Sequence, residues 1–197
     1  MNEIVLIFGA FNPVTNAHIN MGILAKKKYP DADVIFVPAN SNFLKDWKKY
    51  NSEDTLSERD RLKLLYEAVK PYEFKVSEID ILSDGKTYNT VQLFNVLFED
   101  KEIILCLGSD KLSEILTWYK GEELVKNYKF LIIVRDGVEK IPNELKKYKN
   151  NFTFMRGKYK GVSSTKVRNA VKARKLEKVK NLIPEVVYNF YRRNNNV

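Results

Sequence analysis

Short, continuous hydrophobic runs alternate with helical patterns along most of the chain. The runs IVLIF at 4–8, VIFV at 34–37, IILCL at 103–107 and FLIIV at 130–134 contain no charged residue. Runs of this kind are typical of parallel strands that helices cover on both faces. Together with two less regular segments, they predict six strands, at 4–8, 33–37, 74–81, 102–107, 129–134 and 152–155.

Between these runs, apolar residues recur at the three- and four-residue spacing of an amphipathic helix. Helices are predicted at 17–29, 56–69, 89–98, 111–117 with 122–126, 143–148, 164–173 and 184–192. Strands that alternate with helices predict an α/β fold, because parallel neighbours need crossover connections. We therefore expect a Rossmann-like open parallel sheet with helices on both faces, followed by a helical C-terminal segment. No linker or repeat interrupts the pattern, so the prediction is a single domain over residues 1–197.

Composition removes several classes of function. Of the 197 residues, 44% are hydrophobic and 30% are charged, which is ordinary for a globular protein. A single cysteine and a single histidine exclude disulfide scaffolds, zinc fingers and Cys–His hydrolases. The apolar runs are far shorter than the ~20 residues that span a bilayer, and the N-terminus lacks the basic start of a signal peptide. We expect a soluble cytoplasmic protein with no membrane partner.

Positive charge is concentrated near the C-terminus. The net charge is +9, and between Arg156 and Arg193 only two acidic residues accompany many lysines and arginines. Such a segment is either a solvated basic surface or an anion site for the phosphates of a small molecule or a nucleic acid. Charge alone does not separate these interpretations.

The first strand leads into Gly9-Ala10-Phe11-Asn12-Pro13-Val14-Thr15-Asn16-Ala17-His18, a glycine turn followed by a helix start. Thr15 or Asn12 can cap this helix, and the N–H groups of its first turn favour an anion. His18 falls in that first turn. In a purely structural role, His18 would be hydrogen-bonded within the helix terminus. In a functional role it would bind a phosphate, and we favour this role because His18 is the only histidine of the chain.

A second phosphate-binding pattern lies in Gly161-Val162-Ser163-Ser164-Thr165-Lys166-Val167-Arg168. Taken alone, Ser-Ser-Thr is an ordinary helix N-cap. Three hydroxyls at a helix N-terminus, with a lysine and an arginine one turn inward, also suit a polyphosphate, because an arginine grips phosphate oxygens bidentately.

Together, Gly-x-Phe-x-Pro-x-Thr-x-x-His and Ser-Ser-Thr-x-x-Arg resemble the nucleotidyltransferase superfamily with the (H/T)xGH motif. Within it, the chain is most similar to the bacterial nicotinate-nucleotide adenylyltransferases, and the resemblance covers nearly the whole length. Further segments resemble that family in order and spacing: Phe36-Val37-Pro38 with Lys45, Gly108-Ser109-Asp110 with Trp118-Tyr119-Lys120, Val134-Arg135-Asp136-Gly137, and Leu182-Ile183-Pro184-x-x-Val187.

The resemblance implies transfer of AMP from ATP to nicotinate mononucleotide, which gives deamido-NAD and pyrophosphate in NAD biosynthesis. It assigns catalysis to His18, Thr15 and Arg168. It assigns ATP binding to Gly9, Phe11, His18, Ser163, Ser164, Thr165 and Arg168, and mononucleotide binding to Lys45, Tyr88, Thr90, Asp110, Trp118 and Arg135. Mg²⁺ would arrive on ATP, because the sequence contains no dedicated carboxylate cage.

The chain departs from the family pattern at three positions. Thr15 replaces the first motif histidine, as in pantetheine-phosphate adenylyltransferases, Ala17 replaces the motif glycine, and Asn89 replaces an aspartate near the nicotinate ring. The alternatives are therefore the same chemistry on nicotinamide mononucleotide or phosphopantetheine, a relative that has lost catalysis, and a basic nucleic-acid-binding module without turnover. The aromatic residues of this chain are not interleaved as in an RNA-stacking platform, so we expect no nucleic-acid partner. A homo-oligomer is compatible with the sequence.

Overall fold

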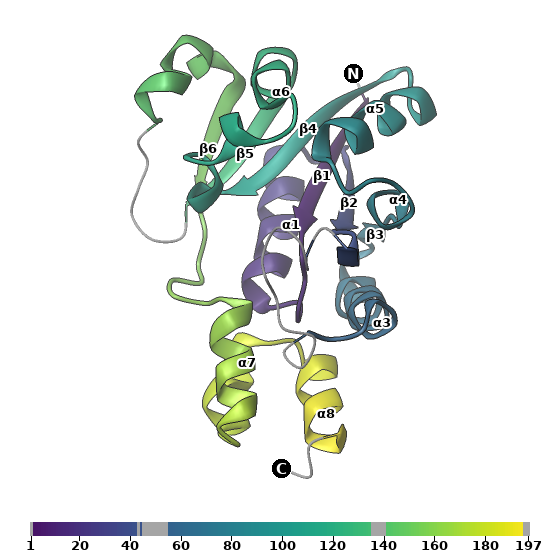
Figure 1. The fold of residues 1–197 in the computed structure, drawn as a ribbon, viewed down its shortest axis with the longest axis vertical. Helices are drawn as coiled ribbons and strands as arrows, with labels where there is room; N and C mark the ends of the chain where they lie inside the picture. Colours follow the sequence, from purple (N-terminus) through teal and green to yellow (C-terminus); the bar gives the residue numbers. More distant parts are fainter. Residues whose placement is uncertain (1, 43, 45–54, 135–140, 195–197) are drawn as a thin grey trace.

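A six-stranded parallel sheet forms the centre of the molecule (Figure 1). The computed structural model describes residues 2–42, 44, 55–134 and 141–194. The strands lie in the order β3-β2-β1-β4-β5-β6, so after β3 the chain crosses back over the sheet to place β4 beside β1. Their bounds are Asn2–Gly9 (β1), Asp33–Pro38 (β2), Lys75–Val76 (β3), Lys101–Gly108 (β4), Lys129–Val134 (β5) and Phe152–Arg156 (β6).

Helices connect the strands and follow the last of them. The α-helices are Asn16–Lys28 (α1), Glu58–Val69 (α3), Ile79–Leu82 (α4), Thr87–Leu97 (α5), Gly121–Asn127 (α6), Ser164–Lys172 (α7) and Glu185–Asn194 (α8). Short 3₁₀ segments are Lys70–Tyr72 (η2), Ser109–Lys111 (η3), Ile115–Thr117 (η4), Asn143–Asn151 (η5) and Leu176–Leu182 (η6). Among the described helices, none is both long enough and apolar enough to cross a membrane.

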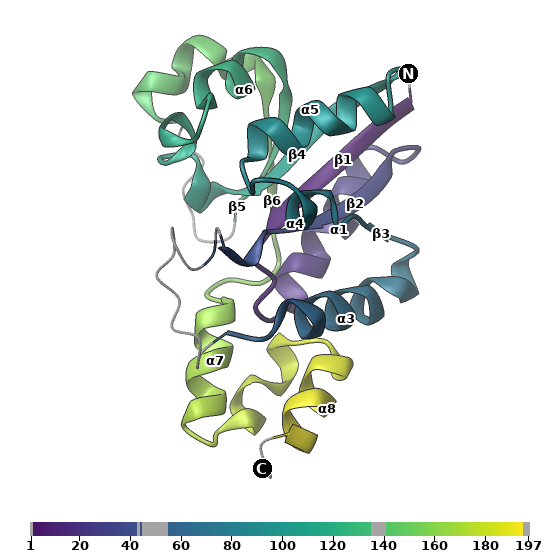
Figure 2. The same ribbon diagram turned by 45° about the vertical axis from the view of Figure 1, so that its right-hand side comes forward.

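The sheet is buried on both faces, as its hydrophobic runs predict. In β1, Val5 and Ile7 belong to a core shared with α1, α3 and α8, whereas Ile4 and Leu6 belong to a core shared with α5 and α6. All four side chains are fully buried. Figure 2 shows the helices on the two sides of the sheet. The Rossmann-like α/β class expected from the sequence is confirmed.

Some of the elements predicted from the pattern are wrong. The segment 74–81 is not one strand: only Lys75–Val76 pairs with β2, and the chain then turns into the short helix α4. The segments 111–117 and 143–148 form 3₁₀ turns rather than α-helices. The sequence interpretation also missed η6. The strand error falls in a short segment, where the hydrophobic pattern distinguishes helix from strand poorly. The other errors concern 3₁₀ segments, which the pattern does not distinguish from α-helix or turn.

The helical C-terminal segment lies beyond the carboxyl edge of the sheet. In Figure 1 the arrow of β1 points toward α7 and α8, so the turn that follows β1 approaches the start of α7. Residues of α8 join the core under α3, including Val187 and Tyr191. Ligands of such sheets bind outside the carboxyl ends of the strands, at the point where the strand order reverses. Here that point lies between β1 and β4.

Candidate active site

The turn after β1 is built around the Phe11 ring. Phe11 is buried, and its ring meets the His18 ring edge to face at a centroid distance of 5.1 Å. A Cβ at Gly9 would lie 2.9 Å from the Phe11 ring, so this close packing requires glycine. The Asn12–Pro13 peptide bond is cis. Because the Phe11 side chain is enclosed, only its backbone can reach a nucleotide.

Hydrogen bonds to Thr15 orient the imidazole of His18. Thr15 is the N-cap of α1, and its backbone N–H donates to His18 Nδ1 over 3.0 Å. The Thr15 hydroxyl oxygen lies 3.0 Å from the same nitrogen. Because a backbone N–H can only donate, Nδ1 is the accepting nitrogen, and the neutral ring carries its proton on Nε2. This arrangement makes Nε2 a hydrogen-bond donor.

The N-terminus of α7 is docked onto the turn after β1. The Ser164 hydroxyl donates to the carbonyl of Pro13 over 2.8 Å, and Arg168 Nη1 donates to the carbonyl of Asn12 over 2.8 Å. Arg168 Nη2 also donates to the Thr165 hydroxyl over 3.2 Å, and the Ser163 hydroxyl, the N-cap of α7, accepts from the backbone N–H of Lys166. The two segments of the (H/T)xGH-like pattern, about 150 positions apart in the sequence, therefore meet in space.

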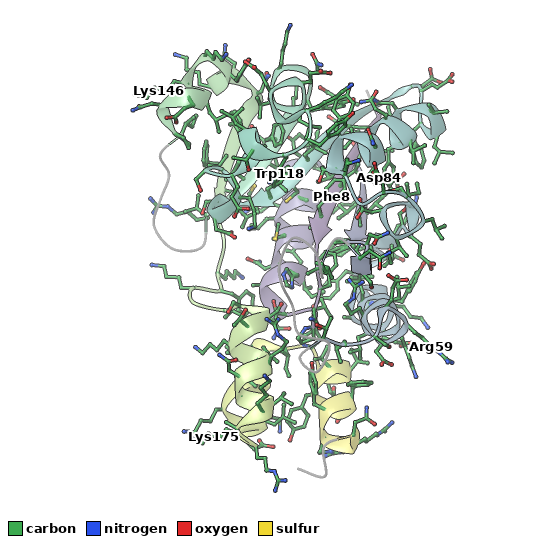
Figure 3. All side chains as sticks on the ribbon, in the orientation of Figure 1. Phe8, Arg59, Asp84, Trp118, Lys146 and Lys175 are labelled. Atoms are coloured by element: carbon green, nitrogen blue, oxygen red, sulfur yellow. The ribbon has the colours of Figure 1, made fainter. Side chains whose placement is uncertain are left out.

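A cavity of about 310 Å³ opens at the carboxyl ends of β1 and β4, and its wall includes Gly9 and Ala10, which lead into the turn after β1. Phe8, Asp84 and Trp118, labelled in Figure 3, lie on its wall. The lining residues are Phe8, Gly9, Ala10, Ala39, Leu44, Asp80, Asp84, Gly85, Lys86, Thr87, Leu107, Lys111, Glu114, Trp118 and Tyr119. Three of the lining side chains are aromatic, and the N-terminus of α5 reaches the cavity through Gly85, Lys86 and Thr87. The site thus combines an aromatic surface with a helix terminus at which the Asp84 carboxylate accepts from the Lys86 N–H over 3.0 Å.

Charged groups on the cavity wall are paired with each other. The Lys86 ammonium lies 2.9 Å from the Asp84 carboxylate, and the Lys111 ammonium lies 2.6 Å from the Glu114 carboxylate. The Asp80 carboxylate is buried and accepts from the Thr90 hydroxyl over 2.6 Å and from the Asn40 N–H over 3.1 Å. Burial raises the pKa of Asp80, and these two hydrogen bonds oppose the rise.

Several residues expected to bind the mononucleotide do not line the cavity. Thr90 is fully buried behind its wall and holds Asp80. Tyr88 packs edge to face against Tyr119, with ring centroids 6.2 Å apart, and thereby supports a wall residue. Asp110 is exposed at η3, with a carboxylate oxygen 3.8 Å from the Lys111 ammonium. Lys45 and Arg135 lie outside the described residues.

The sequence interpretation missed two buried ions of the site. Asp80 lies in the segment that was predicted as a strand, and Arg61 lies in the apolar stripe of α3. A charged residue within an otherwise apolar helical stripe is a signal that could have identified Arg61. In the part of the chain that the structure describes, no group of three or more His, Cys, Asp or Glu side chains is placed to hold a metal ion.

The position of Trp118 on the cavity wall depends on a tight turn that ends at Gly121. The Gly121 N–H donates to the carbonyl of Trp118 over 2.9 Å, and a Cβ at Gly121 would lie 2.0 Å from the backbone oxygen of Ile115. We expect Gly121→Ala to lower the free energy of unfolding by about 2 kcal/mol or more, since backbone must move to admit the methyl group. Thermal unfolding should show a fall in Tm of about 4–8 °C.

Gly161→Ala is the control for this prediction. Among the described residues, no atom beyond the two chain neighbours lies within 4 Å of a Cβ built at Gly161, so the positive φ of 63° is what opposes alanine there. Its cost should be about 1 kcal/mol, the penalty of a left-handed backbone for a residue with a Cβ. Equal losses of stability in the two variants would show that the contact at Gly121 relaxes freely.

Comparison with known proteins agrees with this geometry. Residues 6–170 match the model of the cytidylyltransferase-like family. The chain belongs to this family. A relative from Carboxydothermus hydrogenoformans, named "Probable nicotinate-nucleotide adenylyltransferase", is 31% identical over 98% of this chain and 96% of its own length. A relative of the same name from Endomicrobium trichonymphae is 29% identical over 96% of both chains. The resemblance to bacterial nicotinate-nucleotide adenylyltransferases is therefore confirmed.

Solved structures show the same fold. Plasmodium falciparum nicotinic acid mononucleotide adenylyltransferase, complexed with APC, superposes with a TM-score of 0.79 at 18% identity and covers 100% of this chain and 97% of the solved one. The same enzyme complexed with NaAD gives a TM-score of 0.78 at 19% identity. Because the sequences are only 18–19% identical, this structural likeness establishes the fold of the chain alone.

Proposed function

We propose that this protein transfers the adenylyl group of ATP to nicotinate mononucleotide, giving deamido-NAD and pyrophosphate. An oxygen of the 5′-phosphate attacks the α-phosphorus of ATP, and the bond from that phosphorus to the α,β-bridging oxygen breaks. Pyrophosphate leaves with the electron pair. The attacking phosphate is already an anion, so the reaction requires no protein base, and catalysis rests on positioning and charge stabilisation. The observation that carries the proposal is the docking of α7 onto the turn after β1.

His18 stabilises the α-phosphate in this proposal. The hydrogen bond from Thr15 N–H to Nδ1 supports a donor at Nε2, since it fixes both the tautomer and the ring plane. Negative charge grows on the oxygens around the α-phosphorus during attack, and a preorganised donor binds it without further reorganisation. Thr15 acts mainly through His18, because its side chain is buried at the N-cap.

The start of α7 holds the β- and γ-phosphates. Backbone N–H groups of the first turn point out of a helix N-terminus, and the helix dipole adds positive potential there. The Ser163, Ser164 and Thr165 segment supplies these groups, and Arg168 places its positive charge one turn inward. The hydrogen bonds from Ser164 and Arg168 to the turn after β1 hold this cradle against the helix that bears His18.

The cavity at the carboxyl ends of β1 and β4 takes the pyridine mononucleotide. Trp118 offers a flat apolar surface to the ring. The start of α5 is already bonded to Asp84, which accepts from the Lys86 N–H over 3.0 Å and pairs with the Lys86 ammonium. Nicotinate rather than nicotinamide is supported by the relatives, which are named nicotinate-nucleotide adenylyltransferases.

Mg²⁺ would enter as part of the ATP substrate and would neutralise part of the phosphate charge there. We place the reaction in the cytoplasm, within one domain and without a nucleic-acid partner. Oligomerisation is not part of the proposal.

The test is release of pyrophosphate from ATP with one acceptor at a time. We expect turnover with nicotinate mononucleotide to exceed that with nicotinamide mononucleotide and phosphopantetheine. Higher turnover with phosphopantetheine, the acceptor suggested by Thr15-Asn16-x-His18, would contradict the assigned acceptor. No turnover with any of them, combined with salt-sensitive binding of RNA, would replace the enzyme by a nucleic-acid-binding module.

Trp118→Ala should weaken binding of the mononucleotide without affecting ATP. Stacking of a base on an aromatic side chain is worth about 1–3 kcal/mol, so the KM for nicotinate mononucleotide should rise about 5- to 150-fold. The KM for ATP should stay unchanged and serves as the internal control. Trp118→Phe keeps an aromatic face, so its KM for nicotinate mononucleotide should lie between those of the wild-type protein and Trp118→Ala. Equal KM values for the mononucleotide in all three proteins would exclude stacking on Trp118.

A further inference from the structure

A fully buried arginine lies where β1 and β2 separate. The Ala39 N–H donates to the carbonyl of Gly9 over 2.9 Å, and beyond this contact the two strands no longer pair. Arg61 of α3 reaches into the gap. Its Nη1 donates to the carbonyl of Ala10 over 2.8 Å, and its Nη2 donates to the carbonyl of Ala39 over 2.9 Å. One guanidinium thus joins the two chain segments that leave the sheet at this edge.

The remaining contacts of Arg61 strengthen this connection. Nη2 also donates to the Ser41 hydroxyl over 3.0 Å and lies 3.7 Å from the Glu58 carboxylate. Glu58 in turn accepts from the Ser41 N–H over 3.3 Å. Burial lowers the pKa of Arg61, and the Glu58 carboxylate opposes that shift. The guanidinium and its neighbour therefore hold the loop after β2 at several points.

Burying a charged side chain in a core costs free energy, because the charge loses its hydration. The other α3 residues on this face, including Leu64, Leu65 and Ala68, are apolar. The bonds of Arg61 go to segments that form the site, since Ala10 and Ala39 both line the mononucleotide cavity. Ala10 also leads directly into the turn that carries His18.

We propose that Arg61 is a positioning residue for adenylyl transfer. By bonding the carbonyls of Ala10 and Ala39, it sets the separation between the turn after β1, which leads to His18 in α1, and the segment after β2 that walls the mononucleotide cavity. That separation determines how the acceptor phosphate is aligned with the α-phosphorus. This proposal rests on the proposed function, because only a reaction between two bound nucleotides requires the turn after β1 and the segment after β2 to be held in a fixed relative position.

The chemistry of the side chain makes the proposal specific to arginine. A guanidinium presents separate nitrogens in a rigid planar fork and bonds two carbonyls in fixed relative positions. A lysine in its place keeps the charge but offers one flexible ammonium, which cannot reproduce that geometry. Arg61→Lys therefore separates alignment from charge, and Arg61→Met removes both.

The experiment compares Arg61→Lys and Arg61→Met with Arg59→Met. Arg59 lies on the same helix and is exposed, and Figure 3 shows it pointing away from the sheet. Circular dichroism first establishes that each protein is folded at the assay temperature. Steady-state kinetics then give kcat and both KM values, and calorimetry gives ATP affinity. The wild-type protein is assayed first, and its failure to release pyrophosphate would refute the proposed function rather than the role of Arg61.

We expect folded Arg61→Lys to lose about 10- to 100-fold in kcat, the scale of a small misalignment of reacting groups. Its calorimetric affinity for ATP should stay within about threefold of wild type, and Arg59→Met should match wild type throughout. A merely structural role would lower Tm and leave kcat of the folded protein unchanged. That result in Arg61→Lys would overturn the proposal.

Ser41→Ala covers the case in which neither Arg61 variant folds. It removes one acceptor of Nη2 and leaves the buried charge bonded to both carbonyls. We expect this variant to fold and to lose about threefold or more in kcat, because the guanidinium is held less firmly. An unchanged kcat in Ser41→Ala would overturn the proposal in that case.

Discussion

Replacing His18 by alanine should lower kcat by about 10²–10³-fold, the scale of removing one hydrogen-bond donor from a transition state. The protein should remain folded, because His18 is only half-buried and its contacts with Thr15 and Phe11 are local to the start of α1. Loss of the bond to the Thr15 N–H should lower the free energy of unfolding by about 0.5–2 kcal/mol, the usual cost of a lost helix cap. Pyrophosphate release under saturating ATP and nicotinate mononucleotide measures the effect.

Two further substitutions at this position separate the catalytic nitrogen from the capping one. The amide of asparagine extends about as far as Nδ1, so His18→Asn can keep the cap but loses the donor at Nε2. The amide of glutamine extends about as far as Nε2, so His18→Gln should retain more kcat than His18→Asn or His18→Ala. Asparagine performing as well as glutamine would show that Nε2 is not the donor.

Asn151→Ala is the stability control for His18→Ala, because Asn151 is not part of the proposed site. The Asn151 amide donates to the carbonyls of Val125 and Lys126 at the end of α6. We expect Asn151→Ala to lower Tm to a similar extent as His18→Ala while kcat stays at the wild-type value. A kcat for His18→Ala within about threefold of this control would remove His18 from the mechanism.

Arg168→Ala should raise the KM for ATP by about 10- to 100-fold. A hydrogen bond to a charged group contributes about 1.5–3 kcal/mol. In the proposed site this side chain brings charge to the triphosphate, and it holds α7 against Asn12. KM should rise more than kcat falls, because the β- and γ-phosphates are bound before the reaction as well as during it. Calorimetric titration with ATP gives the same comparison without turnover.

Lys172→Ala is the matched control for this charge. Lys172 is exposed on the same helix, one turn further from the docked end. We expect its KM for ATP to match that of the wild-type protein. Equal KM values for Arg168→Ala and Lys172→Ala would mean that α7 contributes only diffuse positive potential to the site.

The sheet could be predicted from sequence because its strands are buried on both faces. Residues Ile4 to Ile7 of β1 are fully buried, two toward each core, and a run of apolar residues without alternation is what that burial requires. The segment 74–81 could not be predicted in the same way. Its strand is two residues long, and Asp80 is held by Thr90 and Asn40 from elsewhere in the chain.

The active-site segments were predictable to the extent that their chemistry is local. Thr15 and His18 interact across one helical turn, and Ser163 caps the helix that it begins. The position of Arg61 depends instead on which face of α3 meets which loop, and that is set by tertiary packing. A helical stripe read from sequence shows that Arg61 is on the buried side, but not that its partners are carbonyls of two different loops.

The central claim is that the turn after β1 and the start of α7 hold one triphosphate between them. A crystal structure of the complex with a non-hydrolysable α,β-methylene analogue of ATP tests it most directly. We expect the α-phosphonate oxygens within hydrogen-bond reach of His18 Nε2, and the β- and γ-phosphates on the first turn of α7. A triphosphate bound to only one of these segments, with the other turned away from it, would contradict the account.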